Sequence, residues 1–252
     1  MKQAIQEKLT HIAHTEPLHF LLAVESGSRA WGFASPDSDY DVRTIYIRPQ
    51  EYYLQIDEAK DTFEFIENQW FDVGGWDIRK ALRLLRKSNA TLLEWLRSPM
   101  VYTQDDDFTG RLNALAPQYV QAAALLHHYR GIAGNALRNM DLAQPVKLKK
   151  WFYVLRPLLA ARWAVKQGGI PPMTLAELMS EWQTDCAAQI ADLVAIKVEQ
   201  DESYLHTLPP KLQRLTVDLY NEVSELSAPA AEAADSAPLN ELFRETLAAV
   251  YP

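Results

Sequence analysis

Strand-forming patterns are confined to the N-terminal part of this chain, and helical patterns fill the remainder. Short apolar or alternating runs rich in β-branched residues are typical of strands. Such runs predict strands at residues 18–25, 39–47, 62–67 and 69–73. Gly74-Gly75 is expected to break the last of these runs. A chain with this arrangement cannot form a regular alternation of strands and helices along its whole length.

Helical periodicity predicts most of the other elements. Helices are expected at residues 2–14, 77–88, 91–96, 108–115, 118–140, 147–166, 174–199, 210–226 and 239–250. The Ala-, Pro- and Ser-rich segment 227–238 is predicted to be a flexible linker, after which the last helix docks back. We therefore expect an α+β protein, with a mixed domain over residues 1–104 and a helical domain over residues 105–252.

Composition narrows the class of protein and its partners. The 252 residues contain one cysteine, Cys186, which excludes an internal disulfide and a cysteine-based zinc cluster. Neither a signal-peptide pattern nor an apolar run of membrane-spanning length is present, so we expect a cytoplasmic protein without a membrane partner. The formal net charge of −8 argues against binding along a long duplex, although it leaves room for one RNA end.

The segment GSRAWGFASPDSDYDVR, at residues 27–43, joins a small-residue turn to two carboxylates. Gly27 permits a tight turn, and Ser28 adds a hydroxyl and an N–H group suited to phosphate. Asp39 and Asp41 are spaced i, i+2, so a strand would place both side chains on one face. Carboxylates are preferred ligands of Mg²⁺, which travels with nucleoside triphosphates. Each motif alone is more often an ordinary turn or solvated pair, but their combination favours a nucleotide site.

A two-metal site needs a third carboxylate from a neighbouring strand. Asp72 stands in an apolar strand pattern, where an unpaired buried carboxylate is unfavourable by roughly several kcal/mol. A metal would remove that penalty, and Asp72 could then accept the proton of an incoming hydroxyl. Glu64 and Glu67 are rival ligands, and a strand-edge aspartate is the alternative interpretation. Asp77 is expected to cap the following helix.

The predicted helix at 147–166 carries a mixed basic and aromatic row beside its apolar stripe. Lys149, Tyr153, Arg156 and Trp163 follow helical spacing and share a face. Lysine and arginine bind phosphate, and tyrosine can stack on a base. The row therefore predicts contacts with a triphosphate and its base. The alternative is a solvated face on which Tyr153 and Trp163 are half buried.

Other cations have two interpretations each. Arg29 and Arg43 flank the acidic segment and either bind phosphate or pair with an aspartate. The helix at 77–88 also has a basic stripe, made of Arg79, Arg83, Arg86 and Lys87. This stripe either contacts an RNA end or is merely solvated.

Three blocks in this order resemble one family. They are GSRAWGFASPDSDYDVR, WDIRKALRLLRKSNATLLEWLRSP and KLKKWFYVLRPLLAARW. Together they resemble the RlaP group, RNA repair pathway members of the DNA polymerase β-like nucleotidyltransferase superfamily, over residues 18–166. The resemblance implies a small mixed sheet flanked by helices, with Asp39 and Asp41 as metal ligands. It also implies a third acid where Asp72 stands, Mg²⁺ (or Mn²⁺) as cofactor, and a nucleoside triphosphate as substrate.

The leading hypothesis is transfer of a nucleoside monophosphate from a triphosphate to a hydroxyl acceptor. Asp39, Asp41 and Asp72 are the expected catalytic residues and metal ligands. The expected nucleotide-binding residues are Gly27, Ser28, Arg29, Lys149, Tyr153 and Arg156. The acceptor is an RNA end, a protein or a small molecule. A nucleotide sensor without turnover is an alternative, whereas a phosphatase with an aspartate nucleophile is disfavoured because loop residues precede Asp39.

Overall fold

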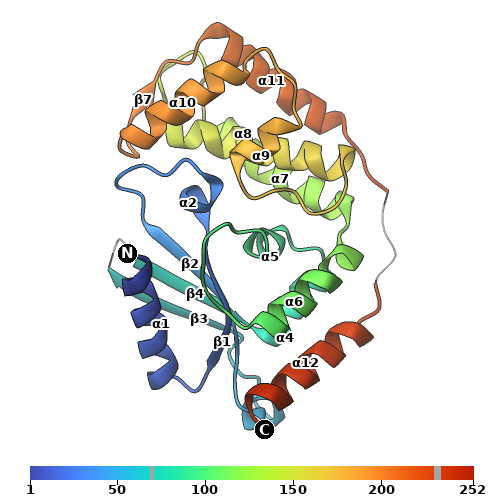
Figure 1. Ribbon diagram of the computed structural model, residues 1–252. Coiled ribbons are helices and arrows are strands. Elements are labelled where there is room, and N and C mark those ends of the chain that lie inside the picture. Colours follow the sequence, from blue (N-terminus) through green and yellow to red (C-terminus); the bar gives the residue numbers. More distant parts are fainter. Residues whose placement is uncertain (69–70, 230–233) are drawn as a thin grey trace. The chain divides into compact units, whose positions relative to one another are not determined.

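The computed structural model describes residues 1–68, 71–229 and 234–252 (Figure 1). Contacts between Cα atoms divide the chain into two compact units. Unit 1 holds Met1–Ser26, Asp39–Val120 and Ala233–Pro252, and unit 2 holds Gly27–Ser38 and Gln121–Glu232. Each unit therefore combines segments that are far apart in the sequence. The expected domain boundary at residue 104 follows the change in secondary structure and stays a prediction.

Unit 1 is built on a mixed sheet, as expected, and this sheet has five strands. Its strands are β1 (His19–Glu25), β2 (Tyr40–Ile47), β3 (Thr62–Asn68), β4 (Phe71–Asp77) and β5 (Val101–Gln104). They lie in the order β3-β4-β2-β1-β5. The pair β2 and β4 is parallel, whereas the other neighbouring pairs are antiparallel. The predicted strands at 18–25 and 39–47 are confirmed, and residues 69–70 of the strand predicted at 69–73 lie outside the described residues.

One face of the sheet is covered by α1 (Lys2–Thr15). This helix buries Ile5, Leu9 and Ile12 at helical spacing. They pack in one cluster with sheet residues that include Val42 and Val73, both fully buried. The two central parallel strands are thus apolar at alternate positions, and the polar residues between them point to the opposite face.

The expectation that Gly74-Gly75 ends a strand is wrong, because β4 runs through both glycines. A Cβ atom added to Gly75 would lie 2.6 Å from Cε1 of Phe63 and would also collide with Oγ1 of Thr44. A Cβ atom on Gly74 would lie 3.3 Å from Nη1 of Arg43. The glycines let side chains from both neighbouring strands cross close over β4.

The remaining helices of unit 1 are short or terminal. They are α3 (Gln50–Leu54), α4 (Ile78–Arg86), α5 (Ala90–Trp95), α6 (Asp106–Leu115), the 3₁₀ helix η1 (Ala116–Tyr119) and α12 (Ala237–Val250). Figure 1 shows α4, α5 and α6 on the side of the sheet away from α1. Asp77 caps α4 as predicted, since its side chain accepts a hydrogen bond of 2.9 Å from the Arg79 N–H.

The last helix belongs to unit 1. The Tyr119 hydroxyl donates to the Asp235 carbonyl (2.7 Å), and the Tyr251 hydroxyl donates to the Ile47 carbonyl (3.4 Å). An ion pair joins Arg111 on α6 to Glu245 on α12. These contacts tie both ends of α12 to unit 1. The predicted linker at 227–238 lies partly outside the described residues, at 230–233.

Unit 2 is mostly helical. Its elements are α2 (Gly27–Trp31), α7 (Ala122–Arg138), β6 (Val146–Lys147), α8 (Leu148–Lys166), α9 (Leu175–Ser180), α10 (Ala187–Glu199), β7 (Leu205–His206) and α11 (Pro210–Glu225). The central helix is α8, which packs against α7, α9, α10 and α11 and buries most of its side chains. The Trp151 indole N–H, for example, donates to Oγ1 of Thr216 on α11 (3.0 Å).

The prediction of one helix over 174–199 is wrong, because α9 and α10 are separate. Oγ1 of Thr184 accepts a hydrogen bond from the Cys186 N–H (3.3 Å). A side chain bonded to the nearby backbone competes with helical hydrogen bonds. The break therefore has a local chemical cause. No helix within the described residues has the length and apolar character needed to span a membrane.

Candidate active site

Two of the predicted metal ligands are register partners at the centre of the unit 1 sheet. Asp41 on β2 lies opposite Asp72 on β4. Nη2 of Arg43 donates to Oδ1 of Asp41 (2.9 Å) and to Oδ2 of Asp72 (2.7 Å). The two carboxylates are each about one-third exposed, at 30% and 32%. The parallel pairing thus brings together carboxylates that are 31 positions apart in the sequence.

The second oxygen of Asp72 is the feature that best fits a cation. Its Oδ1 is buried and has no hydrogen-bond partner among the described residues. A buried, unpaired carboxylate oxygen is unfavourable, and a bound divalent cation would satisfy it. In the described part of the chain, no three His, Cys, Asp or Glu side chains are grouped closely enough to hold a metal ion. Asp41 and Asp72 therefore form a pair of carboxylates bridged by Arg43, and their role as metal ligands stays a prediction.

Asp39 lies one residue before β2 and is exposed. It is therefore outside the regular strand in which i, i+2 spacing places two side chains on one face. Its role as a metal ligand stays a prediction. Of the rival ligands, Glu64 on β3 is exposed, and the side chain of Glu67 lies outside the described set.

A further carboxylate supports this part of the sheet. Glu25 at the end of β1 is fully buried. Its Oε1 accepts a hydrogen bond of 2.8 Å from the Asp41 N–H, and its Oε2 accepts from the Tyr102 hydroxyl. Glu25 therefore fixes the backbone that carries Asp41. The sequence offered no signal for this role, because Glu25 simply ends an apolar run.

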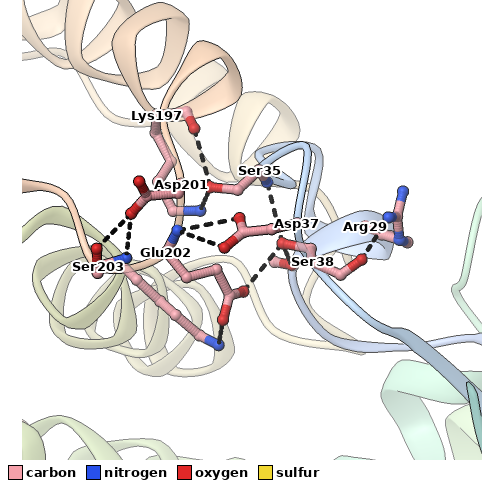
Figure 2. Close-up of polar contacts among 10 residues, drawn as sticks. Arg29, Ser35, Asp37, Ser38, Lys197, Asp201, Glu202 and Ser203 are labelled. Carbon is pink, nitrogen blue, oxygen red and sulfur yellow. Dashed lines mark hydrogen bonds and ion pairs between the residues drawn. The ribbon is translucent and has the colours of Figure 1, made fainter. Parts of the chain in front are cut away.

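In unit 2, the residues of α2 are tied to the loop that precedes Asp39. Gly27 has φ of 61°, which is the left-handed conformation that glycine adopts without strain. The Ser28 hydroxyl donates to Oγ of Ser38 (3.2 Å), and Nη2 of Arg29 donates to the Ser38 carbonyl (2.5 Å). Figure 2 shows Arg29 reaching this carbonyl. Two of the predicted nucleotide-binding residues, Ser28 and Arg29, thus contact Ser38.

Ser38 is also connected to Lys149 of α8, because both residues donate hydrogen bonds to the Glu202 carboxylate. The Ser38 hydroxyl donates to Oε1 of Glu202 (3.0 Å), and Nζ of Lys149 donates to Oε2 of Glu202 (2.5 Å). The hydrogen bond and positive charge of Lys149 help to hold the pKa of Glu202 below its usual value, against the opposing effect of burial. Lys149 and Tyr153 line a pocket of about 690 Å³ in unit 2.

Tyr153, an aromatic residue of the predicted row, packs against another aromatic ring of unit 2. The rings of Tyr153 and Trp31 meet edge to face with centroids 4.9 Å apart. The Arg156 guanidinium lies 4.6 Å from the Trp31 ring centroid. However, Arg156 is only 1% exposed and donates from Nε (3.2 Å) and Nη2 (3.1 Å) to the Met173 carbonyl. Its nucleotide contact stays a prediction, and the geometry shows a buried side chain that supports Trp31.

A buried lysine holds the loop before Asp39. Nζ of Lys197 donates to Oγ of Ser35, and the Ser35 hydroxyl donates to the Lys197 carbonyl (3.1 Å), as Figure 2 shows. The Asp37 carboxylate accepts from the Glu202 N–H (3.0 Å to Oδ1). Burial lowers the pKa of Lys197, while the nearby carboxylates of Glu202 and Asp37 oppose that change.

Comparison with known proteins assigns the chain to a family. The model of the RlaP family, described as the RNA repair pathway DNA polymerase beta family, matches residues 1–245. The chain belongs to this family. A curated relative, the uncharacterized protein YcgL of Bacillus subtilis (strain 168), is 44% identical to this RlaP family member over 181 residues, which cover 72% of this chain and 70% of YcgL.

One solved structure was also matched. It is a nucleotidyltransferase-like protein from Exiguobacterium sibiricum 255-15, with 13% identity and a TM-score of 0.33 over 99% of this chain and 90% of that chain. A TM-score of that size does not establish a shared fold, so the assignment rests on the family match. Membership of the RlaP family makes this chain a nucleotidyltransferase of the polymerase β superfamily.

The predicted site residues of this RlaP family member fall into two sets. The predicted metal ligands all belong to unit 1, and the predicted nucleotide ligands all belong to unit 2. Glu202 and Asp37 were not predicted as site residues. Glu202 lies 53 positions after Lys149 and 164 positions after Ser38. A pairing over such separations leaves no local sequence pattern, so periodicity could not have found it.

Proposed function

We propose that this protein is a Mg²⁺-dependent enzyme that transfers a nucleoside monophosphate from a nucleoside triphosphate to a hydroxyl acceptor. The observation that carries this proposal is the register pairing of Asp41 with Asp72, where Oδ1 of Asp72 is buried without a partner. A polymerase β-like nucleotidyltransferase with two converging carboxylates on its central strands has the donor set that Mg²⁺ prefers. Mn²⁺ would fit the same oxygens.

Asp41 and Asp72 would hold the cation, and Asp39 would complete its ligands. A bound Mg²⁺ would supply the positive charge that orients the acceptor oxygen and neutralises the charge developing on the pyrophosphate. Arg43 pairs with both carboxylates. Its guanidinium would be released when a divalent cation takes over these oxygens, and it would then be available to a phosphate group.

The nucleotide would be held by the residues of unit 2. Lys149 and Tyr153 line the pocket of about 690 Å³, together with Lys147, Lys150 and the amide of Asn135. This volume lies within the usual range of small-molecule sites, which is about 300–1,000 Å³. The lysines would bind the triphosphate, while the Tyr153 ring would contact the base.

Gly27, Ser28 and Arg29 would contribute from the turn. The Gly27 backbone permits close approach, and the Ser28 and Arg29 side chains offer donors to phosphate oxygens. Arg156 remains in the proposed nucleotide set, where its support of Trp31 positions the Tyr153 ring.

Bond changes in the proposed reaction are those of nucleotidyl transfer. A bond forms between the acceptor oxygen and the α-phosphorus, and the bond from that phosphorus to the bridging oxygen of the β-phosphate breaks. Pyrophosphate leaves with the electron pair. The proton of the acceptor hydroxyl would pass to the carboxylate of Asp72.

We further propose an RNA end as the acceptor, in keeping with the RNA repair pathway described for the family. The net charge of −8 favours local contact with a short end over contact along a duplex. A protein or small-molecule hydroxyl is the alternative acceptor.

The test is incubation of the purified protein with each α-³²P-labelled nucleoside triphosphate, Mg²⁺ and short single-stranded RNAs. Asp41→Asn and Asp72→Asn should abolish label transfer, and Asp107→Asn on the exposed start of α6 should not. Asn keeps the size of Asp while removing its charge. Retained transfer in both site variants would overturn the assignment, and loss in Glu64→Gln instead would move the site to β3.

A second candidate is favoured by one observation. Arg43 already compensates both carboxylates, so the protein could bind a nucleotide as a sensor without turning it over. Equilibrium dialysis with labelled triphosphates would then show binding under conditions where neither label transfer nor pyrophosphate release occurs.

A further inference from the structure

Unit 1 contains a basic groove between α4 and α12, with a volume of about 440 Å³. One wall is formed by the α4 residues Arg79, Arg83, Arg86 and by Lys87 just after the helix. Their spacing places them on one side of the helix. The groove therefore concentrates positive charge on a protein whose formal net charge is −8.

Most of these cations are available to a ligand. Arg83, Arg86 and Lys87 are exposed, and no ion pair within the described residues joins them to a carboxylate. Arg79 is engaged differently, because it lies 3.8 Å from Oδ1 of Asp77 and 4.7 Å from the Tyr53 ring centroid. Among the residues that the structure describes, the lining of the groove includes no acidic side chain.

An adjacent hollow limits the basic surface at one end. It shares Arg79 and Arg83 with the groove but is also lined by Asp57, Glu58 and Asp61. These carboxylates would repel an anion there. A polyanion would therefore lie toward Arg86 and Lys87.

The second wall of the groove differs from the first. It is formed by α12 residues that include Leu239, Asn240 and Phe243. Phe243 packs edge to face on Tyr53, with ring centroids 5.0 Å apart, so its position is fixed. An apolar and amide-bearing wall suits bases, whereas the arginine wall suits phosphates.

We propose that this groove binds the sugar–phosphate backbone of a single-stranded nucleic acid, which is the acceptor strand of the reaction proposed above. Charge on one wall and apolar surface on the other match the two sides of a single strand. A helix that binds an anionic membrane buries an apolar face in it, whereas most apolar residues of α4 are already buried within the protein. The role as acceptor rests on the proposed function, but binding of the strand does not.

The groove and the carboxylate pair belong to the same unit. Asp77, the cap of α4, lies five positions after Asp72 on β4, so the start of α4 lies about 17 Å along the strand from Asp72. A single strand of several nucleotides spans such a distance, because its rise is about 3.4 Å per nucleotide. The groove would therefore hold phosphates upstream of a reacting end.

The test measures binding by fluorescence anisotropy with a 5′-labelled single-stranded RNA of about 12 nucleotides, at several salt concentrations and without triphosphate. Arg83→Gln/Arg86→Gln removes two groove cations while keeping good helix formers. The matched control is Lys2→Gln/Arg97→Gln, which removes two exposed cations of unit 1 outside the groove. Circular dichroism melting verifies the fold of each variant.

The groove variant should bind roughly tenfold or more weakly at about 50 mM salt, and the slope of log K against log salt should shrink by about 1.4. The control should bind as the wild type does. Asn240→Asp adds one negative charge to the opposite wall and should also weaken binding. This variant keeps the arginines of α4, so it tests the groove even if the double variant does not fold.

Equal weakening in the groove and control variants would overturn the proposal, because it would indicate diffuse electrostatic attraction. Wild-type affinity in the groove variant would overturn it as well. Failure of the proposed catalysis has a different signature, since Asp72→Asn should abolish transfer while leaving RNA binding intact. If the wild type transfers label but binds no RNA, the groove proposal is wrong and the catalytic one stands.

Discussion

Asp41 and Asp72 are register partners on two parallel strands, and both carboxylates bind the same nitrogen, Nη2 of Arg43. Both ion pairs are partly exposed. Ion pairs with this exposure each contribute about 0–1 kcal/mol to the free energy of unfolding. Their small contribution means that a divalent cation can displace the arginine without a large loss of stability.

We predict that Asp41→Asn and Asp72→Asn each weaken Mn²⁺ binding at least about tenfold, because each removes a charged ligand oxygen. Titration of Mn²⁺ monitored by electron paramagnetic resonance would measure this without relying on activity. Glu64→Gln on the neighbouring strand is the matched control and should leave binding unchanged. Equal Mn²⁺ binding in all three variants would contradict the site.

Replacing Arg43 should have the opposite effect on cation binding. Arg43→Gln removes the positive charge that competes with Mn²⁺, so the affinity should rise by about fivefold or more, equivalent to about 1 kcal/mol. The metal-free protein should become less stable, since two close carboxylates then lose their partner. Mn²⁺ titrations and thermal melting of the same samples would measure both effects. Unchanged affinity would show that the guanidinium does not occupy the cation position.

Gly75→Ala should destabilise the sheet by about 1–3 kcal/mol, because the added methyl group collides with the side chains of Thr44 and Phe63. Gly110→Ala is the control. Gly110 lies within α6, and apart from its chain neighbours and the backbone of its own helix no atom of the described residues lies within 4 Å of a Cβ added there. The free energy of unfolding of the control should rise by about 0.5–1 kcal/mol, because alanine has a higher helix propensity than glycine. Urea denaturation would measure the change in the free energy of unfolding for both variants. Equal changes would contradict the close contact of Thr44 and Phe63 with the Gly75 backbone.

Lys197→Met should change how stability depends on pH. Burial holds the pKa of Lys197 below its unfolded value of 10.5. Between the folded and the unfolded pKa of Lys197, the unfolded chain binds more protons than the folded protein, so the free energy of unfolding rises with pH. Below the folded pKa, Lys197 is protonated in both states and does not make stability depend on pH. Methionine has no such titration. The stability of the wild type relative to Lys197→Met should therefore increase between neutral pH and about pH 10.5, by about 1.4 kcal/mol for each unit of pKa depression.

Denaturation of both proteins across this range tests the prediction. The burial-raised pKa values of Tyr46 and Tyr53 act in the opposite direction above about pH 10. They are present in both proteins and cancel in the difference. Parallel stability profiles would show that Lys197 titrates normally.

Local patterns were enough to predict the elements that frame the site. The apolar run at 18–25, the alternation at 39–47 and the Asp77 cap each correspond to an observed element. The strand β5 was not predicted, because its four residues are too few to reveal an alternation of apolar and polar residues. Gly75 was misread because its reason to be glycine is the crossing of Thr44 and Phe63, which only the strand pairing reveals.

The candidate site was predictable only where its residues are close in sequence. Arg43 was expected either to bind phosphate or to pair with an aspartate, and the structure shows that it pairs with two. That outcome depends on the parallel register of β2 with β4, which no local pattern specifies. The same holds for Glu25, which a sequence pattern shows as the end of a strand and the structure shows as an acceptor for the Asp41 N–H.

Unit 1 includes both the N-terminal strands and α12, and this has a consequence for folding during synthesis. A ribosome that has released residues 1–120 has not yet made Tyr251, whose hydroxyl reaches the Ile47 carbonyl. The sheet must therefore remain without this helix while the whole of Gln121–Glu232 is translated. We expect the nascent sheet to be a client of chaperones during that interval, because its surface for α12 stays uncovered until translation is nearly complete.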